Sequence, residues 1–347
     1  MRRSKRGALP GSRYVFPRAT SIAAASTFGL LLCVLLMACR TVPSESASSP
    51  ELAVATPELY GAGLFTTGAW DFFLAFSPDQ QRVLFGRADD SFEAFELFET
   101  RLDADGRWST PRRPPFAERW SNADPHISPD GRTVFFISNR PHAGEGAARD
   151  SFDIWAAHLQ PDGEWGEAER LPAPVNDAAS DEWCPAVAAN GNLYFGAERP
   201  GTRGGSDLWV SRRVGGVYQA PENLGPAINS SAHEVEAWIA PDERYLLFAA
   251  LKRPEGLGGY DLYLSRRQPD GSWAQAQRLP EGINTPAGDW NHSVSPDGKW
   301  LYFSSSRPHT GPLGERFDAS QDDQTVRGIG DGKKGDIYRV PMRALGL

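Results

Sequence analysis

Cysteine is scarce in this chain of 347 residues, which has three of them. Cys33 and Cys39 both lie in the N-terminal segment that is treated separately below, so Cys184 is alone in the rest of the chain. A single remaining cysteine has no partner for an internal disulfide, even in an oxidising compartment. The sequence therefore excludes a fold that is held together by internal disulfides.

Long helical patterns and the motifs of several enzyme classes are also missing. No segment after residue 57 shows a long apolar pattern with a 3.6-residue period, which excludes extended amphipathic helices. There is no Gly-x-Ser-x-Gly sequence, which argues against a prolyl-oligopeptidase type of hydrolase. His233-Glu234 lacks a second His four residues after the first, and Gly328–Lys334 lacks the phosphate-loop spacing. These absences exclude three common catalytic frameworks.

A repeated pattern runs through the chain from its first quarter to its end. Each copy has a Ser-Pro-Asp-Gly turn or a variant of it and an aromatic strand such as Leu301-Tyr302-Phe303, and from the second copy onward an Asp-aliphatic-aromatic strand such as Asp336-Ile337-Tyr338 follows. An Arg-Pro pair separates the two strands from the second copy onward. The spacings between successive turns are 51, 60, 52 and 55 residues, for turns that begin at Ser77, Ser128, Ala188, Ala240 and Ser295. A fixed period of this size is typical of a repeat architecture.

The repeat unit contains four short strands, which predicts the blade of a β-propeller. Pro presets the backbone of the turn and Gly permits positive φ, so each turn joins two strands as a hairpin. The last copy ends at Leu347 without a fourth strand, while Thr56–Gly61 resembles Ala220–Gly225, which follows a fourth strand in an earlier copy. We therefore predict an all-β fold, a single propeller of five blades closed by the N-terminal strand. Six blades would need one unit without a visible motif.

The recurring Ser-Pro-Asp-Gly, Leu-Tyr-Phe, Arg-Pro and Asp-Ile-Tyr series resembles the Pro-Asp repeat of TolB-type periplasmic propellers and their lipoprotein relatives. The resemblance covers roughly residues 58–347 and extends to the propeller part only. The small α/β domain that precedes the propeller in TolB has no counterpart in this sequence. The resemblance thus implies the fold, and it leaves the function open.

The N-terminal segment predicts export and a lipid anchor. Residues 1–38 contain six basic residues and no acidic one, followed by an apolar run that is too short to span a bilayer, which needs ~20 residues. The run ends in Leu36-Met37-Ala38-Cys39, which resembles a lipobox and implies lipidation of Cys39. An uncleaved anchor and a plain signal peptide are the alternatives. Arg40 follows the cysteine, which favours the outer membrane, facing the periplasm, with surface exposure as the alternative.

This reading divides the chain into a signal peptide (1–38), a Ser-, Pro- and Ala-rich tether (39–57) and the propeller (58–347). Removal of the six basic residues of the signal leaves 30 Lys and Arg against 44 Asp and Glu, a net charge of −14. An acidic surface argues against nucleic acid as a partner. We expect the lipid anchor to be the sole membrane contact.

The inner strands, which precede the turns, carry most of the candidate binding residues. Propellers bind ligands at the mouth of the axial channel, and positions two apart on a strand share a face. Six residues before the turns stand Asp71, Asn122, Glu182, Glu234 and Asp289. Four residues before them stand Phe73, Asp124, Cys184, Glu236 and Asn291, and two residues before them Ala75, His126, Ala186, Trp238 and Ser293. We expect these sets to face the channel and the more apolar residues directly before the turns to pack between blades.

From these sets we predict a binding site at the channel mouth, made by Asp71, Asp124, Glu182, Glu234, Glu236, Trp238, Asp289 and Asn291. Clustered carboxylates could attract a cation, a basic peptide or a sugar, or they could be solvated and pair with nearby arginines. Trp183, Trp238 and Trp290 could stack on a sugar or proline, or pack in the core. Because they recur in four blades, the Arg-Pro arginines and the aspartates that open the later strands are interpreted as structural ties.

We expect a non-catalytic binding module for a protein or glycan of the cell envelope. The alternative is a glycan hydrolase, in which Glu182, Glu234 and Asp289 would supply two carboxyl groups ~5–9.5 Å apart. No cofactor is expected. The insertion Gly314–Gly335 has the acidic composition of a Ca²⁺ loop, with Asp318, Asp322, Asp323 and Asp331, but it lacks the EF-hand spacing, so a solvated loop is the preferred interpretation.

Overall fold

The computed structural model describes residues 56–142, 146–313 and 328–347. The predicted signal peptide, Cys39 and nearly all of the predicted tether lie outside these ranges, as do Asp318, Asp322 and Asp323. The chain divides into two units, Met1–Ala53 and Val54–Leu347, and only the second contains described residues. Across those residues, no helix has the length and apolar character needed to cross a bilayer.

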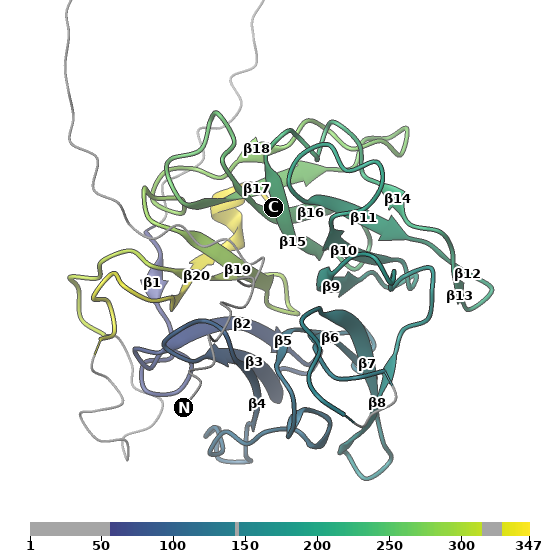
Figure 1. Ribbon diagram of the computed structural model, residues 1–347. Coiled ribbons are helices and arrows are strands. Elements are labelled where there is room, and N and C mark those ends of the chain that lie inside the picture. Colours follow the sequence, from purple (N-terminus) through teal and green to yellow (C-terminus); the bar gives the residue numbers. More distant parts are fainter. Residues whose placement is uncertain (1–55, 143–145, 314–327) are drawn as a thin grey trace, which may run out of the picture. The chain divides into compact units, whose positions relative to one another are not determined.

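The described residues form a β-propeller of five blades, as predicted (Figure 1). The first blade contains β2 (Trp70–Phe76), β3 (Arg82–Ala88) and β4 (Phe95–Arg101). The second contains β5 (Asn122–Ile127), β6 (Thr133–Ser138), β7 (Asp153–Leu159) and β8 (Trp165–Arg170). The third contains β9 (Glu182–Val187), β10 (Leu193–Ala197), β11 (Asp207–Ser211) and β14 (Glu222–Asn223).

The fourth blade contains β15 (His233–Ile239), β16 (Tyr245–Leu251), β17 (Tyr260–Arg266) and β18 (Gln277–Arg278). The fifth contains β19 (Asp289–Val294), β20 (Trp300–Ser305), β21 (Asp336–Pro341) and β1 (Glu58–Leu59). A separate hairpin of β12 (Arg213–Val214) and β13 (Val217–Tyr218) extends the third blade at the margin of Figure 1. Two short 3-10 helices are η1 (Pro115–Ala117) and η2 (Met342–Leu345).

The Ser-Pro-Asp-Gly turn between β5 and β6 shows why these residues recur. Ser128 Oγ donates to Asp130 Oδ1 at 2.5 Å and accepts a hydrogen bond from the amide of Thr133 at 3.0 Å. Gly131 has a φ of 74°, a conformation that residues with a side chain rarely adopt. The turn thereby directs each inner strand into its antiparallel partner.

The N-terminal strand closes the ring, as the incomplete last repeat predicts. β1 pairs with β21 in antiparallel register and completes the fifth blade. Two further bonds continue the contact: the amide of Tyr60 donates to the carbonyl of Ile337 at 2.8 Å, and the amide of Ile337 donates to Thr66 Oγ1 at 3.0 Å. The fourth strand of the last blade therefore comes from the other end of the propeller segment.

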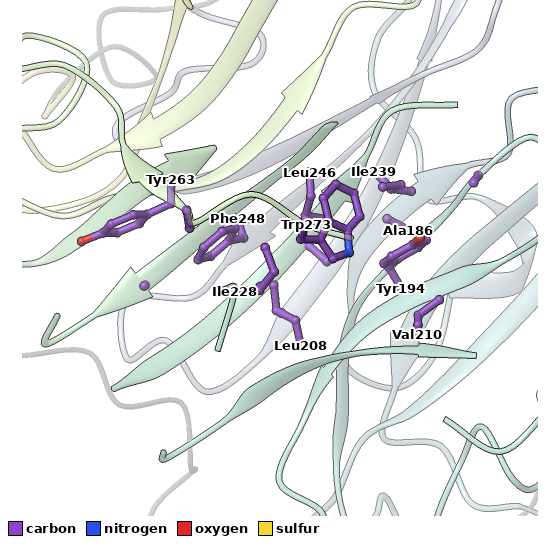
Figure 2. Close-up of a cluster of buried hydrophobic side chains, with 14 residues drawn as sticks. Ala186, Tyr194, Leu208, Val210, Ile228, Ile239, Leu246, Phe248, Tyr263 and Trp273 are labelled. Atoms are coloured by element: carbon purple, nitrogen blue, oxygen red, sulfur yellow. The ribbon is translucent and has the colours of Figure 1, made fainter. Parts of the chain in front are cut away.

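Apolar side chains pack between neighbouring blades. Figure 2 shows the cluster shared by the third and fourth blades, where Tyr194 and Val210 of one blade lie near Ile239 and Leu246 of the next. Ile127 occupies a comparable cluster between the first and second blades. Of the residues directly before the turns, Ile127 and Ile239 contact these clusters, but all five (Phe76, Ile127, Val187, Ile239 and Val294) also line the central cavity described below, so the two predicted faces are not separate.

All five inner strands have an irregular register at the same point. Their pairing with the next strand is interrupted by a β-bulge, four residues before the turn. The bulge residue has a left-handed backbone in each case, with φ between 46° and 60°, at Phe73, Asp124, Cys184, Glu236 and Asn291. A bulge bends the strand and redirects the side chains that follow it.

Candidate functional site

A cavity of about 250 Å³ lies at the turn end of the inner strands and is called the central cavity here. Its lining runs from the bulge residues to the turns of the inner strands. Asp124 and Cys184 mark its buried end, at 4% exposure each, while His126 and Trp238 are half-buried along its wall. Four turn prolines form its outer rim, namely Pro78, Pro129, Pro241 and Pro296. The cavity thus runs from a proline rim to a buried end that contains Asp124 and Cys184.

Hydrogen bonds link the bulge residues of neighbouring blades at this buried end. Asp124 Oδ2 accepts from the amide and from Sγ of Cys184, both at 3.1 Å. Glu236 accepts from Asn291 with both carboxylate oxygens, from the amide at 2.5 Å and from Nδ2 at 3.0 Å. The left-handed backbone turns these amides toward the preceding blade. Two of the predicted acids therefore tie one inner strand to the next.

The acids two positions earlier on the strands have a different environment. Glu182, Glu234 and Asp289 are fully buried, and each pairs with the Arg-Pro arginine of its own blade. The distances from arginine nitrogen to carboxylate oxygen are 2.6 to 2.9 Å, for Arg199–Glu182, Arg253–Glu234 and Arg307–Asp289. In the first blade Asp71 pairs with Arg87 at 2.7 Å.

The two sets of acids therefore have different partners, and the bulge lies at the second set itself. Of the eight predicted site residues, Asp124 and Trp238 line the central cavity, and Glu236 and Asn291 lie at the bulge beside it. Within the described residues, the four acids paired with arginine are not part of its lining: Asp71, Glu182, Glu234 and Asp289. Whether any of the eight binds a ligand stays a prediction.

The recurring Arg-Pro and Asp residues tie strands to loops. Arg140 Nη2 donates to Asn122 Oδ1 at 2.8 Å and to the carbonyl of Phe116 at 2.7 Å. Asp207 accepts from the amide of Arg203 at 2.9 Å, in the loop that precedes its strand. Arg140 thus fixes the segment that precedes β5, and Asp207 fixes the loop that precedes β11.

Burial changes the protonation of several of these carboxyl groups. Burial and the nearby Asp124 carboxylate raise the pKa of Glu236 to about 8, although the amide of Asn291 opposes the shift. Burial also raises the pKa of Glu182 to about 7, against the hydrogen bonds from Ser180 and Arg199. The pKa of Asp289 is raised by burial as well. Burial thus favours the neutral form at Glu236, Glu182 and Asp289.

His292 is the polar residue among several cavity residues that alternation along the strand did not reveal. It lies three residues before the turn and lines the central cavity, because the bulge at Asn291 redirects the strand. The other four blades have Leu74, Pro125, Pro185 and Ala237 at this position. A polar residue at a position that is otherwise apolar is the signal that could have identified it.

Trp183 and Trp290 are buried, at 9% and 3% exposure, which supports core packing for both. Trp238 alone of the three lines the central cavity, where its ring stacks on Tyr245 at 5.8 Å. In the described ranges, no group of three or more His, Cys, Asp and Glu side chains is arranged to hold a metal ion.

No protein-family model and no curated protein matches the chain. Among solved structures, a protein described as a glycoside hydrolase has a TM-score of 0.50 at 12% identity, covering 83% of this chain and 92% of its own. A structure described as a BT0996 RGII complex has a TM-score of 0.52 at 11% identity, and the match covers 84% of this chain and 92% of that structure. An α-L-arabinofuranosidase from Lactobacillus brevis has a TM-score of 0.45 at 12% sequence identity, and the match covers 81% of this chain and 92% of that structure.

At identities this low, the likeness establishes the fold alone. The similar structures include propeller glycoside hydrolases, and the described part of this chain shares their five-bladed architecture. The TolB-type family is not confirmed, because no family model matches.

Proposed function

We propose that the propeller is a binding module that takes one unit of a glycan into its central cavity. Ligand pockets usually enclose ~300–1,000 Å³, so a cavity of about 250 Å³ is suited to a single sugar ring. The observation that carries the proposal is the combination of a half-buried aromatic wall at Trp238 with buried polar groups on β19. The apolar face of a sugar ring packs on an aromatic surface, and its hydroxyl groups need polar partners.

Hydrolysis of the bound glycan is the second candidate function. It is favoured by Glu236, whose raised pKa of about 8 makes it a proton donor at neutral pH, close enough to Asp124 to be influenced by its charge. A glycosidase uses one neutral and one ionised carboxyl group in this way. The hydrolase neighbours have the same propeller architecture.

The hydrogen bonds at the bulge favour the binding module over the hydrolase. Both oxygens of Glu236 already accept hydrogen bonds from Asn291, and Asp124 accepts two from Cys184. A general acid has to offer its proton to the leaving oxygen of the substrate, but Glu236 is 3% exposed and does not belong to the lining of the central cavity. These two carboxyl groups are engaged in joining blades instead.

A glycan-array measurement with matched tryptophan variants tests the binding proposal. We expect the propeller to retain a glycan, and Trp238→Ala to weaken binding about tenfold or more, because stacking is worth ~0.5–1.5 kcal/mol beyond area burial. Trp300→Ala is the control, since Trp300 is half-buried on the strand after the turn and lines no part of the central cavity. Equal binding by both variants, or no glycan retained at all, would refute the proposal.

An assay of product release separates the two candidates. A binding module should retain its glycan in the Glu236→Gln and Asp124→Asn variants and release no product in any form. A hydrolase would release product, and either substitution would lower the rate by orders of magnitude while binding persists.

We further propose that the propeller is carried on the outer membrane through a lipid on Cys39, as the N-terminal sequence indicates. Cell fractionation of a Cys39→Ser variant tests this, and the protein should leave the membrane fraction. Retention of the variant in that fraction would rule out the anchor.

A further inference from the structure

Three polar atoms at the central cavity have no partner among the described residues. They are Nδ1 and Nε2 of His292 and Oγ of Ser293, two neighbours on β19. Both side chains line the cavity, and they are 1% and 7% exposed. The carbonyl of Leu247 lies close enough to influence the pKa of His292, but it is not within hydrogen-bond geometry. A buried polar group without a partner calls for an explanation, and a ligand or water at the cavity is one.

The charge around these atoms limits what they can bind. None of the described residues that line the cavity is Lys or Arg, and Asp124 is an acid at its buried end. Glu236 Oε2 lies 4.0 Å from His292 Nδ1. Burial lowers the pKa of His292 to about 4, so its ring is neutral at physiological pH and has one donor and one acceptor nitrogen. A cation that could pair with a ligand carboxylate is therefore missing from this lining.

We propose that His292 and Ser293 bind the hydroxyl groups of an uncharged sugar unit, and that the central cavity rejects acidic sugars. This inference rests on the proposed function and adds the class of glycan. A sugar hydroxyl both donates and accepts, so it satisfies a neutral imidazole and a serine hydroxyl alike.

Other ligand classes fit the same atoms less well. The carboxylate of a uronic acid only accepts, and it would be desolvated beside Asp124 without a countercharge. An apolar side chain would leave all three atoms unpaired. A cationic amino group only donates hydrogen bonds, so it could not accept from the imidazole N–H of His292 or from the Ser293 hydroxyl.

Binding to matched oligosaccharides tests the inference. The probes are immobilised hexamers of a neutral β-glucan, xylan, arabinan and galactan, and a hexagalacturonate of the same length. We expect at least one neutral hexamer to bind ten times more tightly, or more, than the acidic one. Ser293→Ala and His292→Gln should each weaken that binding about tenfold or more. Ser231→Ala, at an exposed loop position, is the control.

Thermal unfolding of each variant shows whether it is folded. If His292→Gln is unstable, binding by Ser293→Ala still tests the inference. Preference for hexagalacturonate, or neutral binding that is unchanged in Ser293→Ala, would overturn the inference while leaving glycan binding intact. If the unmodified propeller binds no glycan, the proposed function and this inference both fail. Loss of binding in Trp238→Ala without loss in the two β19 variants would refute the inference alone.

Discussion

Arg253 lies between the carboxylate of Glu234 and the carbonyl of Ile228, and its guanidinium is 4% exposed. The guanidinium group also lies over the rings of Phe248 and Tyr263, with Arg253 Cζ 5.1 and 4.6 Å from the two ring centroids. One side chain thus neutralises a buried acid, fixes a loop and packs against two aromatic residues. Arginine suits this position because its planar fork can donate and stack at once.

Substitution of Arg253 by Ala should therefore destabilise the propeller strongly. Removal of one partner of a buried ion pair typically costs ~3–5 kcal/mol, because the remaining charge of Glu234 stays buried without compensation. Arg244→Ala is the matched control, since the Arg244 side chain is 67% exposed. Urea unfolding of both variants measures the difference. A loss below about 1 kcal/mol for Arg253→Ala would show that the pair contributes little.

His292 should make stability fall in mild acid. Its pKa is about 4 in the folded protein, below the ordinary value of 6.5, so the unfolded chain takes up a proton first as the pH falls. The stabilisation is complete above pH 6.5 and is lost between 6.5 and 4, by roughly 3 kcal/mol. Glu236 has the opposite slope, because its raised pKa makes stability decline as the pH rises from its usual range toward 8.

Comparison of the unmodified protein with His292→Gln isolates the histidine. Unfolding free energies measured at intervals from pH 7 to pH 4 should fall less steeply in the variant. Parallel curves for the two proteins would mean that His292 keeps an ordinary pKa in the folded state.

At the scale of the strand, the repeat alone was enough to predict the hairpins, the blades and the closing β1. The rule that alternate residues of a strand share a face did not hold at the bulges. The sequence gives no sign of a bulge, because the bulge residues Phe73, Asp124 and Cys184 share no chemical property. The bulge separates acids that alternation places together, and it brings His292 to the cavity. Backbone conformation at the bulge therefore influences which of the predicted site residues line the cavity.

The left-handed backbone at Asn291 gives a prediction for a single bulge. Asn291→Gly and Asn291→Val both lose the hydrogen bond from Nδ2 to Glu236, but only valine has a branched side chain that is strained at a φ of 48°. The valine variant should be less stable than the glycine variant by ~1–3 kcal/mol. Equal midpoints in urea would argue against strain at this bulge.

At the scale of the whole propeller, stability depends on closure of the ring by residues near its N-terminus. Leu59, Tyr60, Leu64 and Phe65 are buried, and the last three pack in a cluster with residues of both the first and fifth blades. Without this segment, β21 would become an exposed edge. The segment thus joins the two ends of the repeat array.

A propeller that begins at residue 67 should be less stable than one that begins at residue 54 by at least about 5 kcal/mol. Each of the four buried side chains contributes ~1.5–3 kcal/mol by burial alone. Calorimetry of the two proteins measures the effect. Equal unfolding temperatures would contradict the closure of the ring by β1.

The position of a bound sugar tests the central claim most directly, through a crystal structure of the propeller with a neutral oligosaccharide. We predict a sugar ring in the central cavity, with hydroxyl oxygens ~3 Å from a ring nitrogen of His292 and from Ser293 Oγ. A second cleft, of about 320 Å³, lies between the third and fourth blades and is lined by Arg267 and Trp273. A sugar bound in that cleft, with the central cavity empty, would contradict the claim.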